Sequence, residues 1–355
     1  MNGLAVKWFL SAAAAVGLAV ASAGCSAEVE KVRRDEPLRV LGAEQGVRIG
    51  TAIDDEALVD DADYVALVER EVDMVVAENV MKWSTIQPQQ GEFDFEAADR
   101  LVEFAEANEM AVRGHVLVWS RQLPDWVREA NWSRDEAIDV LREHITMLVG
   151  RYRGRIEQWD VVNEPIAQDG DGLEVNPWLE LIGPDHIELA FEFAREADPD
   201  AELFINDFDG AFPGDRTDRL LALAGDLVDV SAPIDGVGLQ FHHRAADSFT
   251  ADDVVSVFDR IDALGLQAAV TEADVRIELV DGEPSAGDLA AQAELVGAIL
   301  EGCIAADNCD TFVMWGLTDR WSWVPDTFPG EGVATLFDTN GAPKPAHEAL
   351  QLVLS

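Results

Sequence analysis

Two short apolar stretches of the sequence end in a glutamate. In the first, WDVVNEP (residues 159–165), Asn163 and Glu164 follow two valines, and in the second, Glu272 follows the valine and threonine at positions 270 and 271. Asn, Glu and Pro are disfavoured inside β-strands. We therefore expect each carboxylate at the end of a buried strand, where it is either a hydrogen-bonded structural group or a reactive one.

A pair of carboxylates surrounded by amides and indoles favours the hydrolysis of a glycosidic bond. One carboxylic acid protonates the leaving oxygen, and the other carboxylate meets the oxocarbenium-like carbon. Indole faces stack on pyranose rings, and amides bind hydroxyl groups. If configuration is retained, the two carboxyl groups should lie roughly 5 to 5.5 Å apart. The alternative is a buried pair with a purely structural role.

Eight short apolar runs alternate with longer segments of helical spacing. The runs are VRIGTAI, MVVAEN, MAVRGHVLVW, IEQWDVVNE, AELFIND, IDGVGLQ, LQAAVTEAD and TFVMWG, and the helical segments include residues 95–108, 135–151, 185–197, 216–229, 252–264 and 289–303. Strand followed by helix, repeated over about 300 residues, predicts an α/β fold, specifically a (β/α)8 TIM barrel. We expect a single catalytic domain over residues 46–355.

Polar and indole side chains gather near the ends of the last seven runs. In chain order they are Glu78, Asn79 and Lys82, His115, Trp119 and Gln122, Asn163 and Glu164, Asn206 and Asp207, Gln240 and His242, Glu272 and Asp274, and Trp315 and Trp323. One such group is readily structural. Seven successive strands ending this way exceed what stability requires, and a barrel of this type has its active site at these strand ends.

Composition excludes several other classes of function. The 355 residues are 48% hydrophobic and carry 69 acidic against 25 basic side chains, a formal net charge of -44. Such a charge repels nucleic acid and anionic lipid and indicates a strongly hydrated surface. The sequence contains no phosphate loop, no dinucleotide-binding glycine pattern and no HExxH motif. We therefore expect no nucleic-acid partner, no cofactor and no metal.

The N-terminus has the pattern of an export signal. Lys7 precedes the apolar segment WFLSAAAAVGLAVA, which indicates a signal peptide over residues 1–24. The following SAGCSAE resembles a bacterial lipobox with Cys25 as the lipidated residue, although Ser22 stands where Leu is preferred. Secretion without a lipid, after ASA, is the alternative. Residues 25–45 are polar and aperiodic and are predicted to form a flexible tether.

Two further cysteines, Cys303 and Cys309, are separated by five residues. In an exported protein they can form a disulfide that closes a small loop and stabilises by roughly 2 kcal/mol. Two free, buried thiols are the alternative.

Over residues 46–350 the sequence resembles glycoside hydrolase family 10, the family of xylanase barrels. The motifs that carry the resemblance, in the order of the family, are ENVMKW, VRGHVLVW, QLPDWV, WDVVNEP, LFINDF, IDGVGLQFH, TEADV, WGLTDRWSW and LFDTNGAPKPA. Each motif alone is weak, but the ordered set is specific.

The resemblance implies a role for each matching residue. Glu164 would be the general acid/base, Glu272 the nucleophile, and Asn163 the partner of the sugar 2-hydroxyl. His242 and Asp274 would orient the Glu272 carboxylate. The residues expected to bind substrate are, besides Asn163, Glu78, Asn79, Lys82, His115, Trp119, Gln122, Asn206, Gln240, Trp315 and Trp323.

The sequence departs from the family at three places near these motifs. Ser120 and Arg121 replace a His-Ser pair after Trp119, Phe208 replaces a tyrosine, and Trp321 adds an indole. The first two departures put the chemistry of the sugar subsites in question.

The predicted function is that of a retaining endo-β-1,4-xylanase, active as a monomer on xylan or xylooligosaccharides. A retaining β-1,4-glucanase or a hydrolase of short xylooligosaccharides would use the same site. A surface lipoprotein that binds carbohydrate without turnover is the alternative from another class. A lipid on Cys25 would be the only contact with a membrane.

Overall fold

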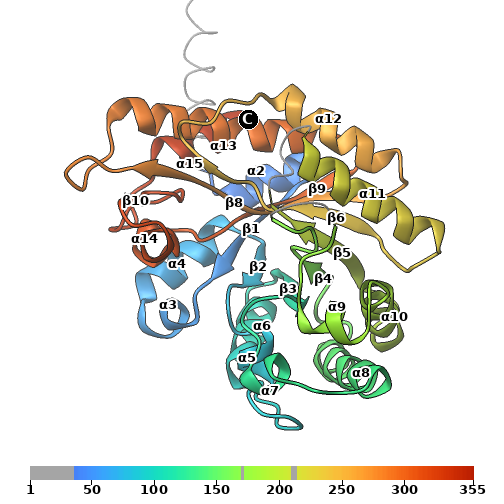
Figure 1. Ribbon diagram of the computed structural model, residues 1–355. Coiled ribbons are helices and arrows are strands. Elements are labelled where there is room, and N and C mark those ends of the chain that lie inside the picture. Colours follow the sequence, from blue (N-terminus) through green and yellow to red (C-terminus); the bar gives the residue numbers. More distant parts are fainter. Residues whose placement is uncertain (1–35, 169–171, 209–213) are drawn as a thin grey trace, which may run out of the picture. The chain divides into compact units, whose positions relative to one another are not determined.

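The computed structural model describes residues 36–168, 172–208 and 214–355, in which eight parallel strands close into a barrel (Figure 1). These strands are β1 (Arg48–Ile53), β2 (Met74–Ala77), β3 (Ala111–Val118), β4 (Gln158–Asn163), β5 (Glu202–Asp207), β6 (Gly236–Leu239), β8 (Gln267–Glu278) and β9 (Cys309–Met314). Each strand pairs with the next one in this list, and β9 pairs with both β8 and β1. The predicted (β/α)8 barrel is confirmed.

Helices surround the strands, with α13, α12 and α11 on one side of the barrel and α6, α8 and α10 on the opposite side (Figure 1). Their bounds are α6 (Glu96–Ala107), α8 (Arg134–Arg151), α10 (His186–Ala197), α11 (Asp215–Asp229), α12 (Ala251–Asp262) and α13 (Ala286–Ala305). These six correspond to the helical segments expected from apolar spacing. Three of them, α8, α12 and α13, begin with a capping box that satisfies the free N–H groups of the first turn.

Shorter elements lie in the connections between strands and helices and after the last barrel strand. The helices are α3 (Asp55–Asp60), α4 (Ala62–Glu71), α5 (Trp83–Ile86), α7 (Asp125–Arg128), α9 (Pro177–Leu181), α14 (Val324–Thr327), α15 (Pro345–Val353) and the 3₁₀ turn η1 (Asp319–Trp321), and the extra strands are β7 (His242–Arg244) and β10 (Glu331–Gly332). Strand β7 pairs with β8 so that His242 lies opposite Asp274.

The prediction of a flexible tether over residues 25–45 is wrong at its C-terminal end. Residues 38–45 form helix α2 (Leu38–Gln45), whose Leu38 and Leu41 are completely buried. The backbone N–H of Leu38 also donates to the buried carboxylate of Glu71 at 3.0 Å. Burying two leucines stabilises the helix against the barrel, so the folded domain begins at about residue 37. The predicted signal peptide and Cys25 lie outside the described residues.

A polar layer inside the barrel supports the residues above it. Arg113 of β3 is fully buried and donates to Asp160 of β4 at 3.1 Å and to Gln158 at 2.8 Å. Asp160 also binds Nδ1 of His115 at 3.0 Å. Burial disfavours the charge on Asp160, but Arg113 and His115 outweigh it and lower the pKa of its carboxyl. The ring of His115 is thereby fixed at the floor of the active-site end.

Cys303 and Cys309 form the predicted disulfide, with a Cα–Cα distance of 5.2 Å. The bond joins the end of α13 to the start of β9. Within the described part of the chain, no helix combines the length and the apolar character needed to cross a membrane.

Candidate active site

An open cleft of about 1010 Å³ lies at the carboxyl ends of the barrel strands. Thirteen of the residues predicted to act there line it: Glu78, Asn79, Lys82, His115, Trp119, Gln122, Asn163, Glu164, Gln240, His242, Glu272, Trp315 and Trp323. They come from β3, β4, β7 and β8 and from the segments that follow β2, β3, β4, β6 and β9. The fold therefore brings residues that are up to 245 positions apart in sequence into one cavity (78 to 323).

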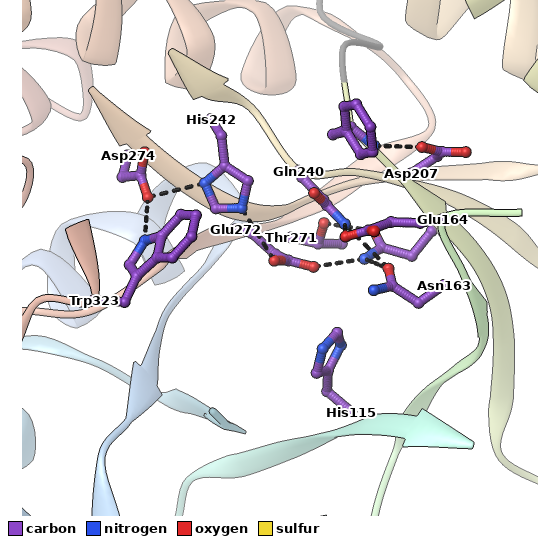
Figure 2. A network of polar contacts seen from close by, with 12 residues as sticks. His115, Asn163, Glu164, Asp207, Gln240, His242, Thr271, Glu272, Asp274 and Trp323 are labelled. Carbon is purple, nitrogen blue, oxygen red and sulfur yellow. Dashed lines mark hydrogen bonds and ion pairs between the residues drawn. The ribbon is translucent and has the colours of Figure 1, made fainter. Parts of the chain in front are cut away.

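Glu272 is held on both of its carboxylate oxygens. Its Oε1 accepts a hydrogen bond from Asn206 at 2.6 Å, and its Oε2 lies 3.2 Å from Nε2 of His242 (Figure 2). Burial disfavours ionisation of Glu272, but the hydrogen bond from His242 and the nearby His115 outweigh it and lower the pKa of this carboxyl. Glu272 is therefore a fixed carboxylate at neutral pH.

His242 is a cation between two carboxylates. Its Nδ1 lies 2.9 Å from Asp274, which also accepts a bond from Nε1 of Trp323 at 2.8 Å (Figure 2). Burial opposes the charge on the imidazole, yet Asp274 and Glu272 raise the pKa of His242 to about 10. Both ring nitrogens then donate, which fixes the ring and the Glu272 carboxylate together.

Glu164 stands on the turn after β4, with its side chain 15% exposed to the cleft. Its backbone N–H donates to the carbonyl of Asn206 at 2.8 Å. The Gln240 amide donates to Glu164 Oε1 at 3.4 Å and to Asn163 Oδ1 at 3.1 Å. Nε of Arg121, an exposed side chain, lies 4.0 Å from Oε2.

The two glutamates are joined by a short chain of amides. Asn206 donates to Asn163 at 2.9 Å as well as to Glu272, and Thr271 donates to the Asn206 oxygen at 2.7 Å, which fixes how the amide is turned. Because Asn163 accepts through its oxygen, its N–H groups are the donors that it can offer a sugar hydroxyl. Both carboxylates belong to one network (Figure 2).

Asn206 does not fit the substrate-binding role predicted for it. It is completely buried and is not among the residues that line the cleft. Its side chain contacts Asn163, Thr271 and Glu272, so it holds the Glu272 carboxylate and the Asn163 amide in place. A residue at a strand end can point into the barrel or the cleft, and sequence position alone does not separate these two cases.

A second polar group faces the cleft from the end of β2 and the loop after β3. Nζ of Lys82 donates to Asn79 at 3.3 Å and lies 4.8 Å from the ring centre of Trp119, and Gln122 donates to the same Asn79 oxygen at 3.4 Å. Burial, with Asp54 adding to it, raises the pKa of Glu78 to about 7, while Lys82 opposes this rise. The group offers charged and neutral donors to sugar hydroxyls.

Several residues of the cleft wall were not predicted. Asp54 and Glu56 follow β1, Arg276 lies on β8, and Arg320 and Phe328 lie beyond β9. Asp54 and Glu56 could have been predicted from the sequence, because they follow β1 just as the other predicted residues follow their strands. The extra indole of Trp321 also lines the cleft, and its Nε1 donates to Asp61 at 3.0 Å.

The part of the chain that the structure describes contains no group of three or more His, Cys, Asp or Glu side chains arranged to hold a metal ion.

The model of glycosyl hydrolase family 10 matches residues 38–352. The chain belongs to this family. It is a glycoside hydrolase, and the resemblance first identified from nine motifs is confirmed over nearly the whole barrel. The match also begins at the first residue of α2, in agreement with the folded domain.

Similar family 10 members and structures carry xylanase names. Endo-1,4-beta-xylanase B of Thermotoga neapolitana is 37% identical, over 90% of this chain and 91% of the relative. The native xylanase 10B of Thermotoga maritima superimposes with a TM-score of 0.86 at 38% identity, covering 90% of this chain and 98% of that one. The xylanase 10B of Thermotoga petrophila RKU-1, solved in complex with xylobiose, has a TM-score of 0.86 at 37% identity, over 90% and 97% of the two chains.

Proposed function

We propose that the protein is a retaining endo-β-1,4-xylanase that cleaves internal bonds of xylan by double displacement. The observation that carries the proposal is the position of Glu164 and Glu272, which face one open cleft and share a network through Asn163, Asn206 and Gln240. Membership of family 10 and the xylanase names of similar proteins support the substrate.

In the first step Glu164 donates its proton to the glycosidic oxygen while Glu272 attacks the anomeric carbon. The bond from that carbon to the leaving sugar breaks, and a glycosyl ester of Glu272 forms. The pKa of Glu272 is lowered by His242, so the attacking group is ionised before substrate binds. Asn163 holds the sugar 2-hydroxyl, a contact that strengthens in the transition state.

In the second step the ester is hydrolysed. Its formation removes the negative charge of Glu272, and Glu164, now deprotonated, takes a proton from water as the water oxygen attacks the anomeric carbon. The Glu272 carboxylate leaves and returns to its bonds with Asn206 and His242. Two inversions at one carbon retain its configuration.

The test is the configuration of the first product released from xylooligosaccharides, followed by proton NMR before mutarotation. The β-anomer is expected first. Release of the α-anomer first would indicate an inverting enzyme and overturn the nucleophilic role of Glu272. Glu272→Ala should remove nearly all turnover while preserving oligosaccharide binding, whereas a binding protein without turnover would have no activity to lose.

Substrate choice is tested by assaying xylan and carboxymethylcellulose side by side. Xylose lacks the hydroxymethyl arm of glucose, and a cleft lined by Gln122 and Trp323 favours the smaller sugar. Faster cleavage of the cellulose derivative would assign a β-1,4-glucanase. Early products longer than xylobiose indicate internal cleavage, while release of xylose alone would assign a hydrolase of short oligosaccharides.

Export, with a lipid on Cys25 or by simple secretion, is part of the proposal and rests on the sequence of the leader. An intact mass of the mature protein separates the two routes. We also propose that the protein acts as a monomer, since one chain supplies both glutamates and the side chains that support them.

A further inference from the structure

The turn that carries Glu164 has a strained backbone. Glu164 has a φ of 53°, in the left-handed region that residues other than glycine rarely occupy. Strain of this kind persists only where the surrounding structure holds it. The contacts of the following residues, Ile166 and Ala167, therefore bear on where the Glu164 carboxyl lies.

Asp207 of β5 and Arg216 of α11 form hydrogen bonds with the backbone of this turn. The N–H of Ile166 donates to Asp207 Oδ2 at 3.2 Å. Arg216, at the start of α11, donates to the carbonyl of Ile166 at 2.7 Å and to that of Ala167 at 3.3 Å. These hydrogen bonds begin only two residues after Glu164.

The side chains of Asp207 and Arg216 form a buried ion pair with each other. Arg216 donates twice to Asp207 Oδ1, through Nε at 3.0 Å and Nη2 at 2.7 Å. The Asp207 side chain is fully buried, and that of Arg216 is 10% exposed. A guanidinium that donates two hydrogen bonds to a carboxylate is held in one geometry, so the pair can fix the position of the turn that it binds.

The same pair reaches the cleft wall through Phe208. The guanidinium of Arg216 lies 3.7 Å from the ring centre of Phe208, and the N–H of Phe208 donates to Asp207 at 2.8 Å. Phe208 lines the cleft together with Glu164. Asp207 and Arg216 themselves are not cleft-lining residues.

We propose that Asp207 and Arg216 are positioning residues that hold the strained turn of Glu164 so that its carboxyl meets the glycosidic oxygen. The inference rests on the proposed function, in which Glu164 is the acid/base. It predicts that disrupting the pair impairs proton transfer and leaves the attack by Glu272 intact, because Glu272 is held by a separate set of contacts from Asn206 and His242.

The charge of Asp207 sets the conditions of the test. Burial raises the pKa of Asp207 to about 7, while Arg216 and the N–H groups of Phe208 and Ile166 oppose the rise. Assays slightly above neutral pH therefore compare the enzyme with the ion pair formed. Two variants are used, Arg216→Met and the double variant Arg216→Met/Asp207→Asn, which leaves no unpaired buried charge.

The experiment measures kcat/KM on aryl β-xylobiosides whose leaving groups range from phenol to dinitrophenol. A phenol needs protonation to leave, whereas dinitrophenolate does not. Both variants should lose roughly 10²-fold on the phenyl substrate, as expected when an acid is displaced by about 1 Å, and change less than about 3-fold on the dinitrophenyl substrate. Azide, which needs no base to attack the glycosyl enzyme, should restore kcat on the dinitrophenyl substrate.

Two controls separate the outcomes. Arg260→Ala breaks an exposed pair between α12 and Asp218 of α11 and should leave both rates unchanged. Glu164→Ala tests the proposed function itself: if it does not show the leaving-group pattern, that function fails. If Glu164→Ala shows the pattern and the Arg216 variants lose activity equally on all substrates, or lose none, only the positioning role is overturned.

Discussion

At the scale of single residues, the cationic His242 controls the charge of the nucleophile. His242→Asn removes the hydrogen bond and the positive charge that lower the pKa of Glu272, and burial then raises this pKa. Because Glu272 acts as the carboxylate, the acid limb of kcat/KM should move to higher pH by about one pH unit, and the maximum should fall roughly 10²-fold. A pH profile on dinitrophenyl β-xylobioside, which needs no acid, isolates this limb.

The adjacent His243 supplies the control for this prediction. It lies on the other side of β7, where its Nδ1 is 3.1 Å from Asp247. His243→Asn removes an imidazole of the same size without touching Glu272. An acid limb that moves equally in both variants would assign the effect to general disturbance of β7.

The residue types of the cleft could largely be predicted from the sequence, because polar groups that end apolar runs have few structural reasons to be there. What could not be predicted is direction. Asn206 and Gln240 both end strands, yet Asn206 is fully buried below the cleft and Gln240 lines it. Arg276 and Phe328 enter the cleft from segments with no distinguishing pattern, and their position depends on how the last loops pack.

At the scale of elements, helix α2 precedes the first strand and packs against β1, α4 and α15. Leu41→Ala should lower the free energy of unfolding by about 2–4 kcal/mol, because it leaves a cavity at a completely buried site. Val40 on the same helix is 43% exposed, so Val40→Ala should change the stability by less than about 0.5 kcal/mol. Urea unfolding measures the free energy of unfolding of both variants. Equal small losses would mean that α2 contributes little to the stability of the domain.

The disulfide between α13 and β9 offers a second prediction at this scale. Replacing both Cys303 and Cys309 by alanine should lower the free energy of unfolding by about 2 kcal/mol, the entropy of closing a small loop. The cleft lies at the other end of β9, next to Trp315, so kcat/KM on xylan should be unchanged. Urea unfolding with and without reductant measures this loss, and a reductant effect that survives in the double variant would contradict it.

The regular elements were predictable where they are long. The apolar spacing of residues 135–151 and 216–229 matches α8 and α11 to within a residue at each end. Helix α2 was missed because eight residues among charged ones, with only two deeply buried leucines, give too little periodicity. Helices α5 and α7 have four residues each, too few for apolar spacing to reveal a helix in the sequence.

At the scale of the whole molecule, the 69 acidic side chains far outnumber the 25 basic ones. Repulsion among these negative charges destabilises the folded state. Salt screens this repulsion, since the Debye length falls from about 30 Å at 0.01 M to about 10 Å at 0.1 M. Salt also weakens surface ion pairs such as Arg142–Glu196 and Arg155–Glu106, but exposed pairs contribute at most about 1 kcal/mol each. The repulsion should dominate.

We therefore expect the Tm to rise by several degrees between about 0.01 M and 0.3 M KCl, a range over which screening is the main effect of salt. Scanning calorimetry measures the Tm, and sucrose at matched osmolality controls for effects unrelated to charge. Activity on a neutral linear xylooligosaccharide should stay nearly constant over the same range, while activity on glucuronate-bearing xylan should increase as the repulsion between like charges is screened. A Tm that falls with KCl would mean that the ion pairs outweigh the net charge, and the acidic surface would then carry no stability cost for salt to relieve.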